Sequence, residues 1–297
     1  MSELYFAYGS NLDLDDLRGF EKRLKNNHEQ NLEDSTNSKN KLFADSVDIL
    51  SEIFFLPDYK LSFPVFSSSR NGGVLDISPK KGHTVPGKLF KVDNWDLLNK
   101  KEGAPNFYKK IDVTVIDING KSYDAITYTV NEEISSDFIK PNKAYVDIIL
   151  KGYDDFGISE KYPWTKDQLI LASENILQSG IDKVFVYGTL KKGQCRESVM
   201  SQFSESVFPN EKINGTLIDV GSFPGLINSK NKVNGEIHQT EKIANLLETV
   251  DSIEGFLGYN ASSLFTRILT LSDSNMCWTY LWNGDTNHPI IESGNWE

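Results

Sequence analysis

Two glutamates in this sequence, Glu102 and Glu254, stand where a helix would end and a glycine follows. Glu254 comes four residues after Val250 and seven after Leu247, a spacing that places its side chain on the apolar side of a helix. Burial on such a face raises the pKa of a carboxyl group toward neutrality, which suits a residue that takes and returns a proton. We therefore interpret both glutamates as candidate general acid/base catalysts.

The interpretation of the first glutamate depends on how far its helix extends. Glu102 comes four residues after Leu98 and seven after Trp95, so it faces the apolar side only if the helix reaches it. An exposed glutamate in the last turn before a glycine cap is the simpler interpretation of an isolated Glu-Gly pair. The recurrence of the pattern in both halves of the chain favours the catalytic interpretation.

A second pair of motifs, each built around Tyr-Gly, could bind an anion. Each motif follows a short apolar segment and precedes a polar stretch. A tight turn at such a glycine leaves backbone N–H groups free to bind a carboxylate or a polarised carbonyl oxygen, although a strand can also end in Tyr-Gly as an ordinary turn. The paired glutamates favour the binding interpretation. The candidate binding residues are Tyr8, Gly9, Ser10 and Asn11 in the first motif and Tyr187, Gly188, Thr189 and Leu190 in the second.

These motifs belong to a longer pattern that occurs twice, which indicates a tandem duplication of one domain. In each copy an apolar segment leads into the Tyr-Gly motif, and a Glu-Gly pair later precedes an aromatic residue and a β-rich run. Between these landmarks, Val85 and Gly87 of the first copy correspond to Val233 and Gly235 of the second. The order of the landmarks is the same in both copies.

Hydrophobic patterning and turn residues predict an α+β chain of two such domains. The predicted limits are residues 1–163 for the first domain, 164–180 for a linker helix and 181–297 for the second domain. Asn119-Gly120 predicts a hairpin. Strands are expected at residues 60–66, 85–92, 109–118, 122–130, 183–187, 215–220, 232–238, 265–271 and 276–282, and helices at 13–30, 144–152, 164–178 and 241–253.

Composition and charge indicate an ordinary globular protein. Hydrophobic residues make up 39% and charged residues 25% of the 297 residues, which allows a packed core. The net charge of −11 disfavours nucleic acid as a partner, because binding the phosphate backbone needs clustered Lys and Arg. The sequence has no apolar run of about 20 residues to cross a membrane and no signal peptide, so we expect a cytoplasmic protein.

Cysteine and histidine spacing does not predict a metal site. Cys195 and Cys277 form no Cys-x-x-Cys motif, and the four histidines form no i, i+4 pair. Cys195 follows the second Tyr-Gly motif, but no histidine motif accompanies it to support nucleophilic catalysis. We expect neither a bound metal nor a structural disulfide.

The ordered motifs resemble the γ-glutamylcyclotransferase family over almost the whole first copy and its shorter AIG2-like branch over the second. The first copy contains YGSN, DYKLSF, VPGKLF and EGAPNFY, and Pro141-Asn142 followed by Tyr145. The second contains VYGTLKKG, FPGL, VNGEI, IEGF and a terminal SGNW. The resemblance implies a small mixed β-barrel flanked by helices in each domain, with the site at the mouth of the barrel.

The resemblance also implies a reaction. In this family the free α-amine of a γ-glutamyl compound attacks its own γ-carbonyl, which releases an amine or amino acid and leaves 5-oxoproline, without a cofactor. Glu102 would then be the general acid/base, the backbone of residues 8–11 would bind the glutamyl end, and Tyr108 and Tyr145 would shape the pocket. Each of these tyrosines could equally be a core residue with a satisfied hydroxyl group.

The second copy departs from the family pattern. Phe265 stands where a tyrosine is usual, and the segment between Glu254 and Phe265 is longer than the corresponding segment of the first copy. The second site could thus be active, altered in specificity or a binding relic, and a non-catalytic binding or scaffolding protein is the alternative function. The resemblance implies a small γ-glutamyl compound as the partner. Its leaving group stays open, because some family members remove γ-glutamyl groups from amines or from larger acyl chains.

Overall fold

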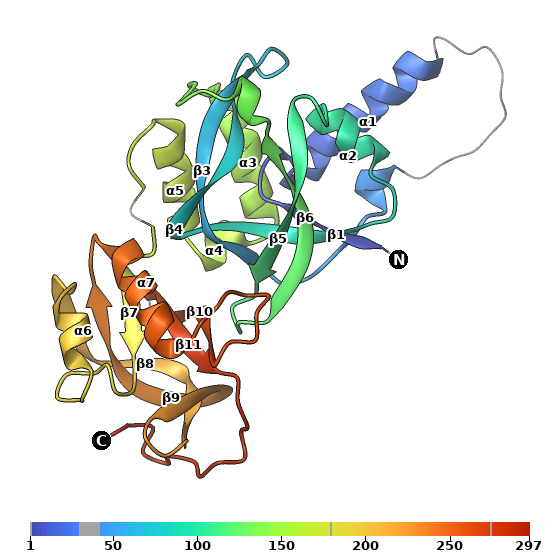
Figure 1. Ribbon diagram of the computed structural model, residues 1–297. Coiled ribbons are helices and arrows are strands. Elements are labelled where there is room, and N and C mark those ends of the chain that lie inside the picture. The colour runs from blue at the N-terminus through green and yellow to red at the C-terminus, as the bar shows by residue number, and fades with distance from the viewer. Residues whose placement is uncertain (1, 30–41, 179, 274) are drawn as a thin grey trace. The chain divides into compact units, whose positions relative to one another are not determined.

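The computed structural model describes residues 2–29, 42–178, 180–273 and 275–297, and the chain divides into two compact units (Figure 1). Unit 1 contains Met1–Pro79, Val85–Val115 and Asp124–Gln178, and unit 2 contains Lys80–Thr84, Ile116–Tyr123 and Ser179–Glu297. The limits of the two domains and of the linker helix derived from the repeat stay a prediction.

Unit 1 is built on a closed five-stranded barrel. Its strands follow the order β1-β6-β5-β3-β4, and β4 pairs back with β1 to close the ring, while β2 extends the sheet beside β4. Strand β1 runs parallel to β6 and antiparallel to β4. The strands are β1 (Glu3–Ala7), β2 (Asp48–Ile49), β3 (Phe54–Ser67), β4 (Gly72–Val92), β5 (Tyr108–Ile116) and β6 (Ser122–Val130).

The helices of unit 1 begin and end at residues suited to those positions. The Asn142 side chain accepts a hydrogen bond from the N–H of Ala144 and so caps the start of α3. Helix α5 ends at Ser173, earlier than the predicted residue 178, because Asn175 adopts a left-handed φ of 57°. The helices are η1 (Ser10–Leu12), α1 (Leu14–Glu29), η2 (Phe43–Asp45), α2 (Asp96–Glu102), η3 (Glu132–Ile134), α3 (Lys143–Asp155), α4 (Ile158–Lys161) and α5 (Trp164–Ser173).

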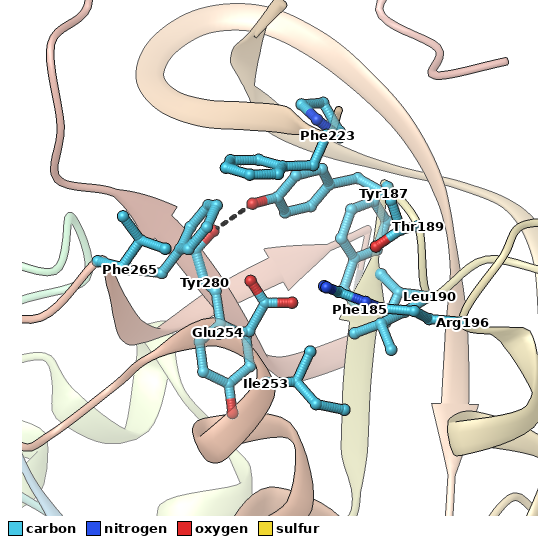
Figure 2. Close-up of a pocket in the computed structure, with 14 residues that line it drawn as sticks. Phe185, Tyr187, Thr189, Leu190, Arg196, Phe223, Ile253, Glu254, Phe265 and Tyr280 are labelled. Carbon is cyan, nitrogen blue, oxygen red and sulfur yellow. Dashed lines mark hydrogen bonds between the residues drawn. The ribbon is translucent and has the colours of Figure 1, made fainter. Parts of the chain in front are cut away.

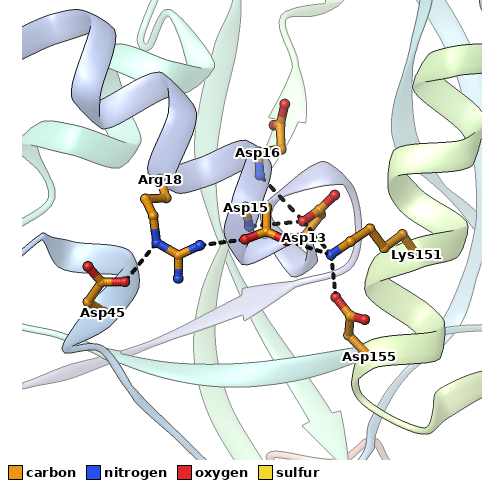
Figure 3. Close-up of polar contacts among 7 residues, drawn as sticks. All are labelled: Asp13, Asp15, Asp16, Arg18, Asp45, Lys151 and Asp155. Carbon is orange, nitrogen blue, oxygen red and sulfur yellow. Dashed lines mark hydrogen bonds and ion pairs between the residues drawn. The ribbon is translucent and has the colours of Figure 1, made fainter.

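A cluster of ion pairs holds the start of α1 in place directly after the first Tyr-Gly motif (Figure 3). The Asp13 carboxylate accepts the N–H of Asp15 at 2.9 Å and the ammonium of Lys151 from α3 at 3.1 Å. Arg18 pairs with Asp15 on its own helix and with Asp45 at 2.7 Å. These contacts join α1 to α3 and to η2, and they fix the chain that leaves η1.

Unit 2 repeats the same strand order in a sheet that is open at one point. The strand order is β10-β11-β7-β9-β8. Strands β10 and β8 correspond to β5 and β3 of unit 1, which are neighbours in the closed ring. No pairing among the described residues joins β10 to β8, so the ring of unit 2 is open at this point. Side chains such as Phe185, Leu217 and Ile237 form its buried core. Its elements are β7 (Lys183–Val186), α6 (Glu197–Ser201), β8 (Ser206–Asp219), β9 (Pro224–Gln239), α7 (Ile243–Glu254), β10 (Phe265–Ser272) and β11 (Asn275–Trp282).

Corresponding hydrogen bonds occur within each of the two units, in addition to the common topology. The hydroxyl of Thr127 donates to the carbonyl oxygen of Phe6 at 2.7 Å, and that of Thr279 donates to Phe185 at 3.0 Å. A methyl group added at Gly87 would lie 2.4 Å from the backbone oxygen of the neighbouring strand, and the same distance results at Gly235. The α+β class and the tandem arrangement predicted from the repeat are therefore confirmed.

The structure also shows strands longer than the sequence pattern predicts. Strand β4 starts at Gly72, well before the predicted residue 85, and β8 starts at Ser206 in place of 215. The added part of β4 contains Pro79, Lys80, Lys81 and Gly82, residues with low strand propensity.

No helix among the described residues has the length and apolarity needed to span a membrane.

Candidate active sites

Glu102 is the last residue of α2, and its side chain reaches the first Tyr-Gly turn. Gly103 ends the helix in the left-handed conformation, with φ 62° and ψ 30°. The half-buried carboxylate of Glu102 accepts a hydrogen bond of 2.6 Å from the side-chain amide of Asn11 in η1. The glycine cap and the orientation toward a cavity, considered above as alternative interpretations, thus occur together.

The amide group of Asn11 connects Glu102 to the barrel. The same Nδ2 atom donates a second hydrogen bond to the Tyr5 hydroxyl at 2.7 Å, so both of its protons are used. Burial raises the pKa of Glu102, although the charge of Lys101 and the hydrogen bond from Asn11 oppose the shift. The carboxyl group therefore binds a proton more readily than an exposed glutamate does.

The first two backbone N–H groups of the 3-10 turn after Tyr8 are not used in the hydrogen bonds of the turn itself. The N–H of Leu12 donates to the carbonyl oxygen of Gly9 at 3.0 Å, and that of Asp13 donates to Ser10 at 3.2 Å. The N–H groups of Ser10 and Asn11 precede the first donor of this 3-10 turn, as at the start of any helix. Tyr8, Gly9, Ser10 and Asn11 line a cavity of about 30 Å³ together with Glu102.

Tyr108 and Tyr145 have satisfied hydroxyl groups and also line this cavity. The Tyr108 hydroxyl donates to the carbonyl oxygen of Leu75 at 2.7 Å, and the N–H of Leu75 donates to the Tyr145 hydroxyl at 3.3 Å. Both rings also line a larger cavity of about 590 Å³, which shares Ser10 and Glu102 with the smaller one. The two interpretations of these tyrosines, pocket wall and core residue, are therefore compatible.

Three charged residues beside Glu102 were missed by the sequence analysis. Arg70 forms a bidentate pair with Asp16 at 2.9 and 2.6 Å, and Lys101 also pairs with Asp16. Burial opposes ionisation of Asp16, but the hydrogen bond from Arg70 and the charge of Lys101 hold its pKa below the ordinary value. Arg70 and Lys101 line the larger cavity. No motif marks these residues, because Asp16 and Arg70 come from separate elements.

The second cavity repeats the arrangement of the first around Glu254 (Figure 2). Glu254 ends α7, and Gly255 follows with φ 62° and ψ 34°, nearly the values at Gly103. Tyr187, Gly188, Thr189 and Leu190 line this cavity of about 110 Å³ with Glu254. Burial raises the pKa of Glu254 from its ordinary value of 4.5 to about 7.

Corresponding hydrogen bonds hold the tyrosine of each Tyr-Gly motif. The Tyr8 hydroxyl donates to the carbonyl oxygen of Tyr128 at 2.8 Å, and the Tyr187 hydroxyl donates to that of Tyr280 at 2.8 Å. Tyr128 in turn donates to Asn99, and Tyr280 donates to Asp251. Asn99 and Asp251 each stand three residues before the cavity glutamate. The predicted site residues are thus brought together within each unit.

The second cavity differs from the first in its polar groups. Leu190 occupies the position of Asn11, and Phe265 occupies that of Tyr108, so an amide and a hydroxyl group are missing. Glu254 accepts no hydrogen bond from the described part of the chain, whereas Arg196 lines the same cavity and lowers the pKa of Glu254 through its charge. Cys195 is exposed and does not line the cavity.

Replacing Glu254 by glutamine should stabilise unit 2 at about pH 8 and have no effect below about pH 4.5. The unfolded chain ionises Glu254 near its ordinary pKa of 4.5, but the folded chain does so only near 7, so the parent loses stability across this interval. Glutamine avoids that loss, which we estimate at about 1–3 kcal/mol for a partly exposed group. Urea unfolding of both proteins across this pH range measures the difference.

The control for this prediction is Glu248→Gln, which removes an exposed carboxylate from the same helix. It should leave the stability nearly unchanged at each pH. A Glu254→Gln protein that is no more stable than the parent at high pH would show that the folded protein does not disfavour the charged form of Glu254.

Two α+β units of one topology, each with a helix-ending glutamate beside a Tyr-Gly turn, define a tandem protein with two cavities at corresponding positions. Models of the γ-glutamylcyclotransferase/AIG2-like family match both halves of the chain. A family model described as "Gamma-glutamyl cyclotransferase, AIG2-like" matches residues 184–297, and one described as "AIG2-like family" matches residues 84–165. Each half of the tandem arrangement thus has its own family match.

Individual relatives resemble one half or the whole chain. A candidate gamma-glutamylcyclotransferase of Vibrio cholerae is 29% identical over 116 residues, which are 38% of this chain and 93% of that protein. A solved gamma-glutamyl cyclotransferase is 24% identical, with a TM-score of 0.44 over 57% of this chain and 87% of that one. YkqA from Bacillus subtilis is 12% identical, with a TM-score of 0.31 over 96% of this chain and 85% of that one.

Proposed function

We propose that this protein is a γ-glutamylcyclotransferase-like enzyme that cyclises a γ-glutamyl amide to 5-oxoproline and releases the amine, without a cofactor. The observation that supports this function most directly is the half-buried Glu102 carboxylate, held by Asn11 at 2.6 Å beside the first amides of the Tyr-Gly turn. The names of the matching family model and of the Vibrio cholerae relative agree with it.

Glutamate can take the first proton of the reaction and return it to the leaving nitrogen. The α-ammonium group of the substrate, with a pKa of about 8, first loses a proton to Glu102. Its nitrogen then attacks the γ-carbonyl carbon, which forms the new C–N bond of the five-membered ring and places negative charge on the carbonyl oxygen. As the original amide C–N bond breaks, the leaving nitrogen takes this proton back from Glu102. The ring nitrogen loses its second proton, which ends on the released amine as its ammonium form, so the glutamate ends in its initial state.

The turn and the tyrosines would hold the substrate in the conformation that cyclises. The N–H groups of Ser10 and Asn11, which the turn does not use in its own hydrogen bonds, can bind the glutamyl end or the charge that develops on the carbonyl oxygen. Tyr108 and Tyr145, which are both hydrogen-bonded to the backbone of Leu75, limit the space around the folded substrate. Orienting two reacting groups in this way can lower a barrier by about 7–11 kcal/mol.

We propose the same role for Glu254 in the second cavity, with Tyr187, Gly188, Thr189 and Leu190 as the turn. A pKa of about 7 is close to the optimum for a group that must both accept and donate a proton near neutral pH. The alternative for this cavity is binding without turnover, and the loss of polar groups at Leu190 and Phe265 is the observation that favours it.

Cyclisation can be distinguished from hydrolysis by the product and by the need for a free α-amine. We expect the protein to release 5-oxoproline and the amine in equal amounts from some members of a panel of γ-glutamyl amino acids and amines. The same compounds acetylated on the α-nitrogen should give no product, because the acylated nitrogen is not nucleophilic. Release of glutamate, or turnover of the acetylated compounds, would contradict cyclisation.

A further inference from the structure

Arg196 is a charged residue of the second cavity for which the shared motifs provide no role. It lies at the start of α6, and its guanidinium points toward the carboxylate of Glu254 (Figure 2). Of the residues that line this cavity, only Arg196 and Glu254 carry charge, while Phe223, Leu264 and Phe265 contribute apolar surface. A ligand of this cavity therefore meets one cationic group and one titratable acid.

The Arg196 guanidinium has no acceptor of its own in the described part of the chain, where no ion pair or hydrogen bond joins it to a carboxylate. The arginine of the first cavity differs in this respect, because the guanidinium of Arg70 donates to both carboxylate oxygens of Asp16. An arginine that already has a carboxylate partner has fewer donors left for a ligand. Arg196 keeps its donors available, and a guanidinium binds a carboxylate with two parallel hydrogen bonds.

The segment that carries Arg196 is held at several points, so the position of the arginine is well defined. The N–H of Arg196 donates to the carbonyl oxygen of Thr189 at 2.9 Å, which folds the segment back onto the second Tyr-Gly turn. Glu236 accepts the N–H of Lys192 at 2.7 Å and contacts His238 at 2.9 Å. His238 contacts Ser204 at 2.6 Å, beyond α6, so both ends of the segment are attached to β9.

We propose that Arg196 binds the α-carboxylate of the γ-glutamyl substrate in the second cavity. This inference rests on the proposed function, in which Glu254 takes a proton from the α-amine. The α-carboxylate is attached to the same carbon atom as that amine, so it must lie close to Glu254 and within the region that Arg196 faces. Arg196 thereby replaces part of the polar surface that the first cavity has at Asn11 and Tyr108.

The test uses chains that carry Glu102→Gln, so that turnover reports the second cavity. Arg196→Ala should raise KM for a γ-glutamyl amide by about 10- to 100-fold, the range of a lost hydrogen bond to a charged group, and change kcat much less. Arg196→Lys should recover part of this loss. Lys230→Ala, which removes an exposed cation of β9 that does not line the cavity, is the control and should behave like its parent.

A double-mutant cycle identifies the group that Arg196 binds. In a second substrate the α-carboxylate is replaced by a carboxamide, and both substrates are tested with and without Arg196→Ala. We expect the parent to discriminate between the two substrates and the variant to have lost most of this discrimination. An equal rise in KM for both substrates would overturn the proposal, because Arg196 would then act on another part of the substrate or on the fold.

Binding of the product tests the same contact without turnover. Titration with 5-oxoproline, followed by the methyl resonances of Ile253 and Leu264 in the second cavity, should give a dissociation constant that Arg196→Ala raises by about 10-fold or more. If the second cavity turns over no substrate but this effect is found, the assignment of Arg196 holds while the catalytic role of Glu254 fails. An unchanged dissociation constant, or no binding to the parent, would overturn it.

Discussion

A chain that carries both Glu102→Gln and Glu254→Gln should release 5-oxoproline about 10²- to 10⁴-fold more slowly than the parent, with little change in KM. Glutamine keeps the shape of glutamate, and its carbonyl oxygen can still accept the hydrogen bond from Asn11. It cannot take a proton from the α-ammonium group or return one to the leaving nitrogen. The loss should therefore fall on kcat, because the binding surfaces of both cavities remain.

Four proteins separate the contributions of the two cavities: the parent, the two single variants and the double variant. If both cavities are active, each single variant retains the activity of the other cavity, and substrates that differ in leaving group can reveal different preferences. If the second cavity only binds, Glu102→Gln alone should reach the rate of the double variant. A double variant that is as fast as the parent would remove both glutamates from the mechanism.

Replacing Asp251 by asparagine should destabilise unit 2 by about 3–5 kcal/mol, the usual effect of removing one partner of a buried ion pair. Asp251 pairs with the fully buried Arg267 at 2.8 Å and accepts the hydroxyl proton of Tyr280 at 2.6 Å. The guanidinium of Arg267 also lies over the ring of Trp278, 5.0 Å from its centroid. Asparagine can still accept from Tyr280, but it removes the negative charge that faces this guanidinium.

The expected loss can be measured by urea unfolding with hydrogen exchange followed in β10 and β11, which carry Arg267 and Tyr280. The control Glu248→Gln changes an exposed carboxylate of the same helix and should shift stability by no more than about 0.5 kcal/mol. If Asp251→Asn unfolds at the same urea concentration as the parent, the buried pair contributes little to the stability of unit 2.

Local patterns were sufficient to predict most elements that carry the two sites. The predicted strand at residues 122–130 coincides with β6, and the predicted helix at 241–253 differs from α7 by two residues at its start and one at its end. Both glutamates end helices, and both following glycines adopt the same left-handed conformation. These features depend on helical periodicity and on the preference of glycine for positive φ, which act between neighbours in the chain.

Long strands and the closure of the sheet were less predictable. The early part of β4 contains proline, glycine and two lysines, and pairing with neighbouring strands decides that such a segment is extended. The same applies to the five-stranded ring, which is closed in unit 1 and open between β10 and β8 in the described part of unit 2. Side-chain periodicity indicates which face of a strand is buried, but it does not identify the strand beside it.

The sequence by itself determined that one α+β domain occurs twice, with a glutamate and a Tyr-Gly turn in each copy. Only the tertiary structure decided what surrounds each glutamate. Asn11, 91 residues away in the chain, lies beside Glu102, and the guanidinium of Arg196 lies beside Glu254. Local propensities act over a few residues, whereas these contacts exist because the strands bring distant helix ends and turns to one cavity. The pKa of each glutamate follows from that enclosure, since desolvation depends on the packed surroundings.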